Sequence, residues 1–191
     1  MKIAVDLDDT LSVVDRVTRA KGYIARSGLP YKLVDENAHA LESVFDWELP
    51  EVLKFVREGG ITVFTDAEAR KGARECLAAL REAGHEIVVL TARSKEWFVN
   101  PEKVSRDWLE KRRIPYDEIV AGIDDKGSYC AAHGISVLID DGLEHCLSAQ
   151  NAGVKAILFV GKHNLARAAE IRYGGTNWQQ IAAILESIIK S

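Results

Sequence analysis

Acidic residues cluster behind the first apolar run of the chain. The segment Asp6-Leu7-Asp8-Asp9-Thr10 follows residues 3–5. Side chains two positions apart in a strand point to the same side, so Asp6 and Asp8 are expected to leave the strand end as a pair. Two carboxylates held close together repel each other unless a cation, a proton or a bound phosphate group compensates. The spacing therefore indicates a charged site at this strand end.

Other polar groups stand near the ends of three later apolar runs. They are, in chain order, Thr91 after residues 86–90, Lys126 after residues 118–121, and Asp140 with Asp141 after residues 136–139. The carboxyl ends of parallel strands meet at one edge of a sheet, where open α/β sheets bind ligands. Carboxylate oxygens suit Mg²⁺, while a hydroxyl and an ammonium group can hold an anion. The sequence thus predicts an oxygen-rich pocket for a metal and an anion.

The elements that must position these residues alternate along the chain. Strands are predicted at 3–5, 86–90, 118–121, 136–139 and 156–160, and helices at 67–83, 101–113, 127–133, 142–152 and 177–190. Such alternation is typical of a parallel sheet that is covered by helices on both faces. We expect an α/β, Rossmann-like three-layer sandwich with a mainly parallel five-stranded sheet.

One interval is too long for a simple crossover. Roughly 80 residues separate the first two predicted strands, far more than a strand-helix-strand connection needs. Helical patterns within it cover 13–27, 36–45 and 50–57. We predict a small, mostly helical cap at residues 11–64, inserted after the first strand of a core formed by residues 1–10 and 65–191.

Composition narrows the protein class. The 191 residues are 47% hydrophobic and carry a net charge of −4, which argues against a disordered chain and against a general nucleic-acid coat protein. Three cysteines are a sparse, odd set that we expect to be reduced. With no run resembling a signal peptide or a membrane span, we expect a cytoplasmic protein without a membrane or a nucleic-acid polymer as partner.

The ordered set Asp6-x-Asp8-x-Thr10, Thr91, Lys126 and Asp140-Asp141, each near the end of an apolar strand, resembles the four motifs of the haloacid dehalogenase superfamily of phosphatases. The resemblance covers nearly the whole chain. Within the superfamily, the Leu-Thr-Ala-Arg segment at 90–93, the small cap and the segment 133–141 are similar to the cytosolic 5′(3′)-deoxyribonucleotidases and to a set of bacterial nucleotidase-like proteins.

The resemblance implies a role for each motif residue. Asp6 would attack phosphorus and form an aspartyl-phosphate, and Asp8 would protonate the leaving alcohol and then deprotonate the attacking water. Mg²⁺ would be held by the Asp6 side chain, the Asp8 backbone carbonyl and Asp140. Asp141 would lie behind these ligands and hold them in place, or would reach the metal through a water molecule.

The phosphate side of the site is implied in the same way. Thr91 would hydrogen-bond a phosphoryl oxygen, and Lys126 would neutralise charge on the phosphate and on Asp6. Thr10 would brace the loop after Asp6 on the substrate side. Arg93 is a further candidate substrate-binding residue, although an arginine after a strand can equally lie on the surface. Position 9 is Asp where many members of the superfamily have Gly.

The expected function is Mg²⁺-dependent hydrolysis of phosphomonoesters, with a small phosphorylated substrate, a nucleoside or deoxynucleoside 5′-monophosphate. A sugar phosphate or another small phosphorylated metabolite is the alternative substrate. The alternative to an enzyme is a non-catalytic, metal-binding regulatory module. Dehalogenation is disfavoured, because Asp8 and the acidic metal site have no role in displacing a halide.

Two further patterns leave alternatives open. Aromatic residues of the cap region could stack on a base or simply form its core, and basic residues there could meet a charged substrate; these candidates are Tyr23, Tyr31, Phe45, Trp47, Phe64, Arg16, Arg19 and Lys21. Trp97 and Phe98 could line the substrate entrance or pack under the cap. Cys130, His133, His145 and Cys146 could ligate zinc, but their spacing matches no usual zinc site.

Overall fold

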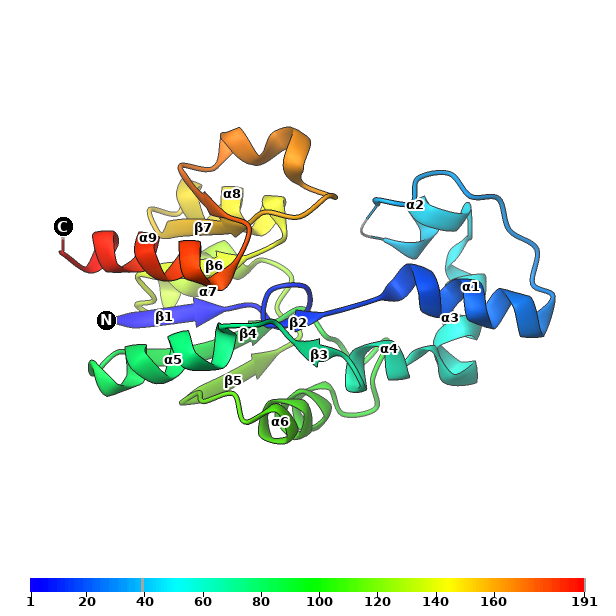
Figure 1. Cartoon of the computed structure of the whole chain (residues 1–191), viewed down its shortest axis with the longest axis horizontal. Coiled ribbons are helices and arrows are strands. Elements are labelled where there is room, and N and C mark those ends of the chain that lie inside the picture. Colours follow the sequence, from blue (N-terminus) through cyan, green and yellow to red (C-terminus); the bar gives the residue numbers. More distant parts are fainter. Residues whose placement is uncertain (39, 191) are drawn as a thin grey trace.

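A six-stranded parallel sheet forms the centre of the computed structural model, which describes residues 1–38 and 40–190 (Figure 1). Its strands, in spatial order, are β5 (Glu118–Ala121), β4 (Glu86–Thr91), β1 (Lys2–Val5), β6 (Val137–Asp140), β7 (Lys155–Phe159) and β8 (Tyr173–Gly175). The α/β, Rossmann-like fold is confirmed. The predicted count of five strands is wrong, because β8 adds a sixth at the edge.

Alternating side chains of the strands supply two hydrophobic cores. Ile3 and Val5 of β1 pack on one face with α5 (Ala73–Glu82), α6 (Pro101–Arg112) and α9 (Trp178–Lys190). Ala4, which lies between them, packs on the other face with α7 (Lys126–Ala132) and α8 (Leu143–Asn151). Period-two alternation of buried residues on both faces explains why these strands are almost continuously apolar.

The chain order creates a crevice at the carboxyl edge beside β1. The chain runs from β1 outward through β4 to β5, and then crosses to the other side of β1 for β6, β7 and β8. Neighbouring loops therefore diverge on the two sides of β1, and such switch points are where open parallel sheets bind ligands. In register, Val5 lies beside Val89 of β4 and Ile139 of β6, so the residues after all three strands converge.

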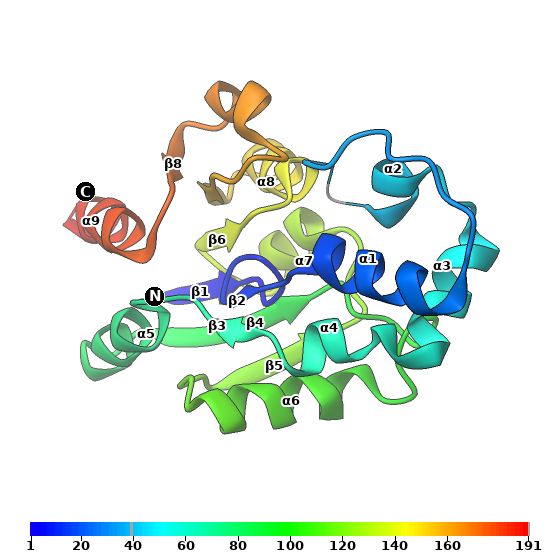
Figure 2. The same cartoon turned by 45° about the vertical axis from the view of Figure 1, so that its right-hand side comes forward.

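Four helices lie beyond this edge of the sheet, and both chain ends lie on the opposite side (Figures 1 and 2). They are α1 (Arg16–Ser27), α2 (Leu41–Phe45), α3 (Leu49–Phe55) and α4 (Thr62–Thr65). The segment η1 (Val56–Gly60) between α3 and α4 is a kink, because Glu58 and Gly59 depart from helical backbone angles. Tyr23, Phe45 and Phe55 are buried in a core of their own. We call residues 11–64 the cap; its division from the core at these boundaries stays a prediction.

A short pair of antiparallel strands lies where the chain enters the cap and where it returns to the core. Strand β2 (Ser12–Val13) pairs with β3 (Glu68–Ala69), and the amide of Arg70 donates to the carbonyl of Leu11 at 2.8 Å. This pairing corrects two helix predictions. The first cap helix begins at Arg16 instead of residue 13, and the helix predicted from residue 67 begins at Ala73, after Gly72 in a left-handed conformation with φ of 88°.

The second predicted cap helix is also shorter in the structure. The helix predicted at 36–45 is limited to Leu41–Phe45, and residue 39 lies outside the described residues. After β7, a 3-10 helix, η2 (Leu165–Glu170), leads into β8. None of the helices in the described part of the chain combines the length and the apolar character that a membrane span requires.

Candidate active site

The loop after β1 is fixed to the end of β6. The amide of Asp6 donates to the carbonyl of Ile139 at 2.9 Å, which continues the sheet by one residue. Thr10 exchanges two hydrogen bonds with Asp141: its hydroxyl donates to Oδ1 at 3.1 Å and accepts from the amide at 3.0 Å. Trp178 of α9 donates to the carbonyl of Thr10 at 3.1 Å. Thr10 therefore braces the loop that carries Asp6 and Asp8.

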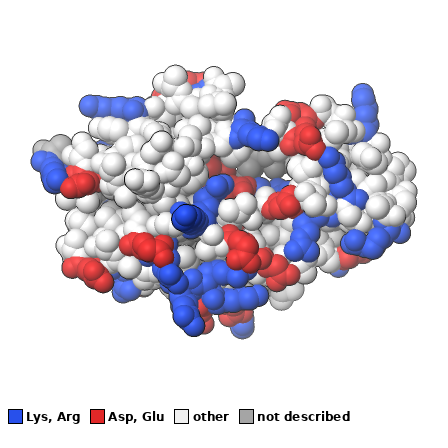
Figure 3. All heavy atoms as spheres, in the orientation of Figure 1, with Lys and Arg blue, Asp and Glu red and all other residues white. Residues whose placement is uncertain are grey.

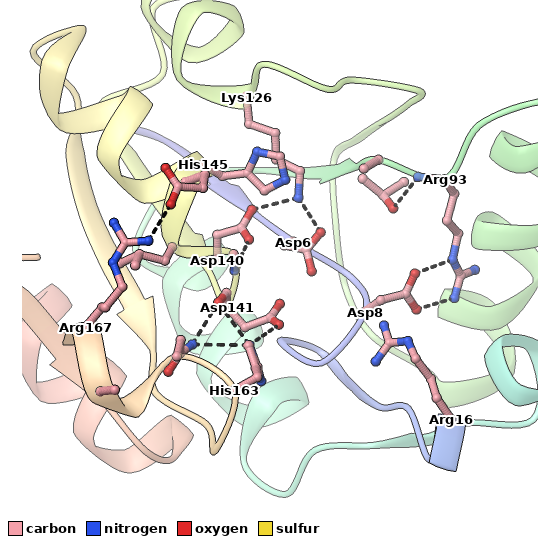
Figure 4. Close-up of a pocket in the computed structure, with 17 residues that line it drawn as sticks. Asp6, Asp8, Arg16, Arg93, Lys126, Asp140, Asp141, His145, His163 and Arg167 are labelled. Carbon is pink, nitrogen blue, oxygen red and sulfur yellow. Dashed lines mark hydrogen bonds and ion pairs between the residues drawn. The ribbon is translucent and has the colours of Figure 1, made fainter. Parts of the chain in front are cut away.

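Lys126 lies at the start of α7 and is almost fully buried. Its ammonium group donates to Asp6 Oδ1 at 2.5 Å and to Asp140 Oδ2 at 2.7 Å (Figure 4). Burial alone would lower the pKa of Lys126, but the two carboxylates outweigh burial and raise the pKa above its ordinary value. Lys126 is therefore a permanent positive charge between the ends of β1 and β6.

Three buried carboxylates surround one point of the site. Oxygen atoms of Asp6, Asp140 and Asp141 lie within 4.8 Å of one another. Burial raises the pKa of Asp6 well above its ordinary value, and the neighbouring carboxylates raise it further against the opposing effect of Lys126. Three acidic groups with one ammonium leave excess negative charge in a buried place. A set of closely spaced oxygen donors with such a charge excess fits a hard divalent cation.

Thr91 is the last residue of β4, on the other side of β1, and Arg93 lies two residues beyond it. Thr91 is buried, and its hydroxyl accepts a hydrogen bond from the amide of Arg93 at 3.2 Å. The Arg93 guanidinium binds both carboxylate oxygens of Asp8, from Nε to Oδ2 at 2.8 Å and from Nη2 to Oδ1 at 2.7 Å. Asp6 and Asp8 thus have different cationic partners, although both border one cavity.

That cavity has a volume of about 500 Å³. Figure 4 shows Asp6, Asp8, Lys126 and Asp140 directed into it, and Figure 3 shows charged atoms of both signs in a hollow between the cap and the rest of the molecule. The structure brings together in its wall the expected residues Asp6, Asp8, Thr91, Arg93, Lys126, Asp140 and Asp141. Thr10 lies behind the wall of this cavity, where its hydroxyl is hydrogen-bonded to Asp141.

A second cavity of about 320 Å³ lies between the cap and the loop after β4. The two cavities share Asp8, Arg16, Ala92 and Arg93 in their walls. The second one is lined mainly by apolar side chains, among them Leu41, Val52, Phe55, Phe64, Trp97 and Phe98. The charged cavity and the apolar one are thus neighbours, with Asp8 in the walls of both.

Comparisons with solved structures identify the fold. A hydrolase of the haloacid dehalogenase (HAD) family from Deinococcus radiodurans R1, with bound phosphate and sodium, superposes with a TM-score of 0.68 at 18% identity, over 97% of this chain and 95% of that one. The haloacid dehalogenase-like hydrolase SP0104 from Streptococcus pneumoniae gives 0.66 at 15% identity, over 96% and 97%. The chain has the haloacid dehalogenase fold.

A third structure with this fold carries a sugar bisphosphate. CbbY from Rhodobacter sphaeroides, a mutant in complex with xylulose-(1,5)bisphosphate, gives a TM-score of 0.63 at 17% identity, over 93% of this chain and 94% of that one. No protein-family model matches the chain, and no curated protein matches it significantly.

The structure also brings to the site two residues that showed no pattern in the sequence. His163 lies 3.1 Å from Asp141 Oδ2, and Asn164 donates to the Asp141 carbonyl at 2.8 Å. The same carboxylate raises the pKa of His163 above its ordinary value. Both residues follow β7, so the rule that ligand sites gather at strand ends, applied to this strand as well, would have found them.

The candidates from the cap separate into three groups. Arg16 reaches the site, where it pairs with Asp9 and lines both cavities, while Arg19 and Lys21 are exposed. Among the aromatic residues, Phe64 lines the second cavity, as do Trp97 and Phe98 from the loop after β4. Tyr23, Phe45 and Trp47 form the cap core, and Tyr31 packs edge-on against Phe45.

A zinc site is not supported. Cys130 and Cys146 are buried in the apolar core of α7 and α8, while His133 is exposed and stacks on Tyr129 with ring centroids 3.8 Å apart. Within residues 1–38 and 40–190, the carboxylate cluster of Asp6, Asp140 and Asp141 is the group with metal-ligating geometry.

Proposed function

We propose that the protein is a Mg²⁺-dependent phosphomonoesterase that works through an aspartyl-phosphate on Asp6. The observation that carries this proposal is the buried cluster of Asp6, Asp140 and Asp141 beside Lys126, with Asp8 and Thr91 on the same cavity. Phosphoryl transfer needs a nucleophile and strong neutralisation of charge, and this cluster supports the proposal with a buried carboxylate, Asp6, beside the buried ammonium group of Lys126.

The first half-reaction needs two carboxylates. An oxygen of Asp6 forms a bond to phosphorus while the bond from phosphorus to the ester oxygen breaks, and Asp8 supplies the proton that the leaving alkoxide takes up. In the second half-reaction Asp8 takes a proton from water, whose oxygen attacks phosphorus and releases Asp6 and inorganic phosphate. In the structure Asp6 pairs with Lys126 and Asp8 pairs with Arg93, so each carboxylate is held by a separate side chain.

The remaining residues bind and neutralise. Asp6, the Asp8 carbonyl and Asp140 would hold Mg²⁺, with Asp141 behind them; when bound, the ion orients the phosphate and offsets its charge. Lys126 would neutralise one phosphoryl oxygen, and the buried hydroxyl of Thr91 would donate to another. The side chains of Asp6, Thr91, Lys126 and Asp140 are buried, and preorganised charges act more strongly in buried places than in water.

For the substrate class we propose nucleoside or deoxynucleoside 5′-monophosphates. In the proposed reaction the leaving group lies on the side of phosphorus opposite Asp6, towards Asp8, and Asp8 also lines the apolar cavity of the cap. Its aromatic and aliphatic walls favour a flat, weakly polar group such as a base. A sugar phosphate stays the second candidate, since CbbY, which has the same fold, binds a sugar bisphosphate.

Release of inorganic phosphate from a panel of nucleotides, sugar phosphates and an aryl phosphate, with Mg²⁺ present, tests the proposal. We expect activity on the aryl ester and the highest kcat/KM for nucleotides. Asp6→Asn should abolish turnover while the protein stays folded. Folded, Mg²⁺-loaded protein that hydrolyses none of these esters would refute the proposal, and a preference for sugar phosphates would select the second candidate.

Trapping with beryllium fluoride separates an enzyme from a non-catalytic metal-binding module. A competent nucleophile forms a stable complex with beryllium fluoride that imitates the phosphorylated carboxylate. We expect such a complex on Asp6 of the wild type and its absence in Asp6→Asn. A wild type that binds Mg²⁺ but forms no complex would favour the module.

A further inference from the structure

Arg93 holds the carboxylate of Asp8 in a fixed orientation. The two planar groups meet through paired hydrogen bonds of 2.8 Å and 2.7 Å, one to each carboxylate oxygen. The side chain of Arg93 is 2% exposed and that of Asp8 is 16% exposed. A two-point contact of this kind restricts both the position and the rotation of the carboxylate, which a single ammonium contact would not do.

The guanidinium group of Arg93 is itself held from behind. Its Nη1 donates to the hydroxyl of Ser105 at 3.3 Å, and Ser105 donates in turn to the carbonyl of Pro101 at 2.8 Å at the start of α6. The rings of Phe64 and Phe98 lie 5.6 Å and 5.3 Å from the guanidinium carbon. This carbon lies within the range of cation–π attraction for both rings. The orientation of Arg93 is therefore set by the protein before any substrate arrives.

These contacts distinguish Arg93 from the groups suited to bind phosphate. Lys126 contacts Asp6, the expected nucleophile, whereas the Nε and Nη2 donors of Arg93 are both used on Asp8. Asp8 and Arg93 also lie at the boundary of the charged and the apolar cavity. In a displacement by Asp6, that boundary is on the leaving-group side of the phosphate.

We propose that Arg93 is a positioning residue that aims the Asp8 carboxylate at the ester oxygen of the leaving group, and that it does not bind the substrate phosphate. This inference rests on the proposed phosphatase function. It means that the contribution of Arg93 depends on how much the leaving oxygen needs a proton. An alkoxide leaving group needs one, whereas p-nitrophenolate leaves readily without it.

The test compares two substrates in one set of variants. The kcat/KM values for a nucleoside 5′-monophosphate, an alkyl ester, and for p-nitrophenyl phosphate are measured with wild type, Arg93→Gln and Arg93→Lys. Loss of positioned acid catalysis typically costs 10²–10⁴-fold, so Arg93→Gln should lose about 100-fold on the nucleotide and no more than about 5-fold on the aryl ester. Arg93→Lys, which keeps the charge but not the paired contact, should lose about 10-fold on the nucleotide.

Binding of inorganic phosphate, measured by calorimetry with Mg²⁺ present, is the second readout. A positioning residue leaves this dissociation constant within about 2-fold of wild type, whereas loss of a charged hydrogen bond to phosphate weakens it by about 10-fold or more. Lys95→Ala removes an exposed cation from the same loop and is the matched control, with no expected effect on either substrate. Equal losses on both esters, or a 10-fold loss of phosphate affinity, would overturn the inference.

Ser105→Ala covers the case in which Arg93→Gln does not fold. Ser105 is fully buried, and its hydroxyl links the Arg93 guanidinium to the Pro101 carbonyl, so its removal takes away a support of Arg93. We expect a loss of about 5-fold on the nucleotide alone, equivalent to about 1 kcal/mol for one neutral hydrogen bond. An unchanged kcat/KM on both esters, or an equal loss of kcat/KM on both, contradicts the inference. A wild type that hydrolyses neither ester instead refutes the proposed function, and the inference with it.

Discussion

Gly127 offers a sharp test of how α7 positions Lys126. A Cβ atom added to Gly127 would lie 2.3 Å from the backbone carbon and the hydroxyl of Ser148 and 2.4 Å from the amide nitrogen of Ala149. Two of these three atoms belong to the backbone of α8, so no side-chain rotation can relieve the clash. The substitution Gly127→Ala must therefore push α7 and α8 apart.

The size of the displacement follows from these contacts. An ordinary Cβ contact begins near 3.4 Å, so the two helices must separate by about 1 Å. Lys126, the neighbouring residue, would then be pulled from its 2.7 Å contact with Asp140 beyond hydrogen-bonding distance. Overpacking of this kind costs about 1–3 kcal/mol. At this chain length, each kcal/mol lowers Tm by about 2–4 °C.

Thermal unfolding and steady-state kinetics of Gly127→Ala measure both effects. We expect a lower Tm and a fall in kcat of about 100-fold, because a displacement of 1 Å in a catalytic group can cost that much. Gly22→Ala in α1 is the control: its Cβ would meet only the Arg26 guanidinium at 3.5 Å, and it should stabilise the helix by about 0.5–1 kcal/mol. If Gly127→Ala kept wild-type Tm and kcat, the tight packing of α7 on α8 would not be what places Lys126.

Two further predictions concern charge. Mg²⁺ at about 100 times its dissociation constant should raise the Tm of the wild type by about 5–10 °C, because binding then adds about 2.7 kcal/mol to the free energy of unfolding. Asp140→Asn should lose most of this Tm shift. Equal Tm shifts in both proteins would place the metal elsewhere. Burial would raise the pKa of Asp117, but hydrogen bonds from Arg81 and from the amide of Ile87 outweigh it and lower the pKa below its ordinary value. Its stabilisation is therefore present above about pH 4 and is lost as the pH falls through the folded-state pKa. Urea unfolding should show Asp117→Asn less stable than wild type by about 1 kcal/mol at pH 7, with a difference that shrinks as the pH falls below about 4. A difference that stays constant with pH would contradict this origin.

The central strands could be predicted from the sequence because they are buried on both faces. Residues 86–90 and 136–139 form short apolar runs bounded by polar residues, and the structure places strands there within one residue at each end. In such strands burial alone determines the residue types, so local composition carries the signal. The motif residues that follow these strands were located for the same reason, since a strand end fixes where the next side chain lies.

Pairings between distant segments could not be read in the same way. Glu68–Ala69 becomes a strand only because Ser12–Val13 lies beside it, and nothing in two residues distinguishes a strand from the first turn of a helix. Strand β8 is Tyr173–Gly175, with two glycines in three residues, a composition that disfavours strands. Its place at the sheet edge depends on β7, and a Cβ on Gly175 would lie within 3.1 Å of α9 side chains.

The contacts of Arg93 and Arg16 could not be predicted from the sequence for a related reason. Long flexible side chains can reach several partners, and the sequence fixes only where each one starts. The sequence left Arg93 open between a substrate-binding residue and a surface residue, and its paired contact with Asp8, 85 positions earlier, depends on how the loop after β4 passes the loop after β1. Spacing within a motif predicts which backbone positions converge, and packing decides which charges then pair.

Asp9 illustrates how one such pairing ties the cap to the catalytic loop. Its φ of 63° lies in the left-handed region, which costs roughly 1 kcal/mol or more for a residue other than Gly. The carboxylate offsets this cost, since it accepts the amide of Val14 at 3.0 Å and pairs with Arg16 at the start of α1. A glycine would relieve the strain but lose both contacts. Arg16 also lines both cavities. Asp9 therefore holds the first helix of the cap against the loop that carries Asp6 and Asp8, and a glycine at this position could not do so.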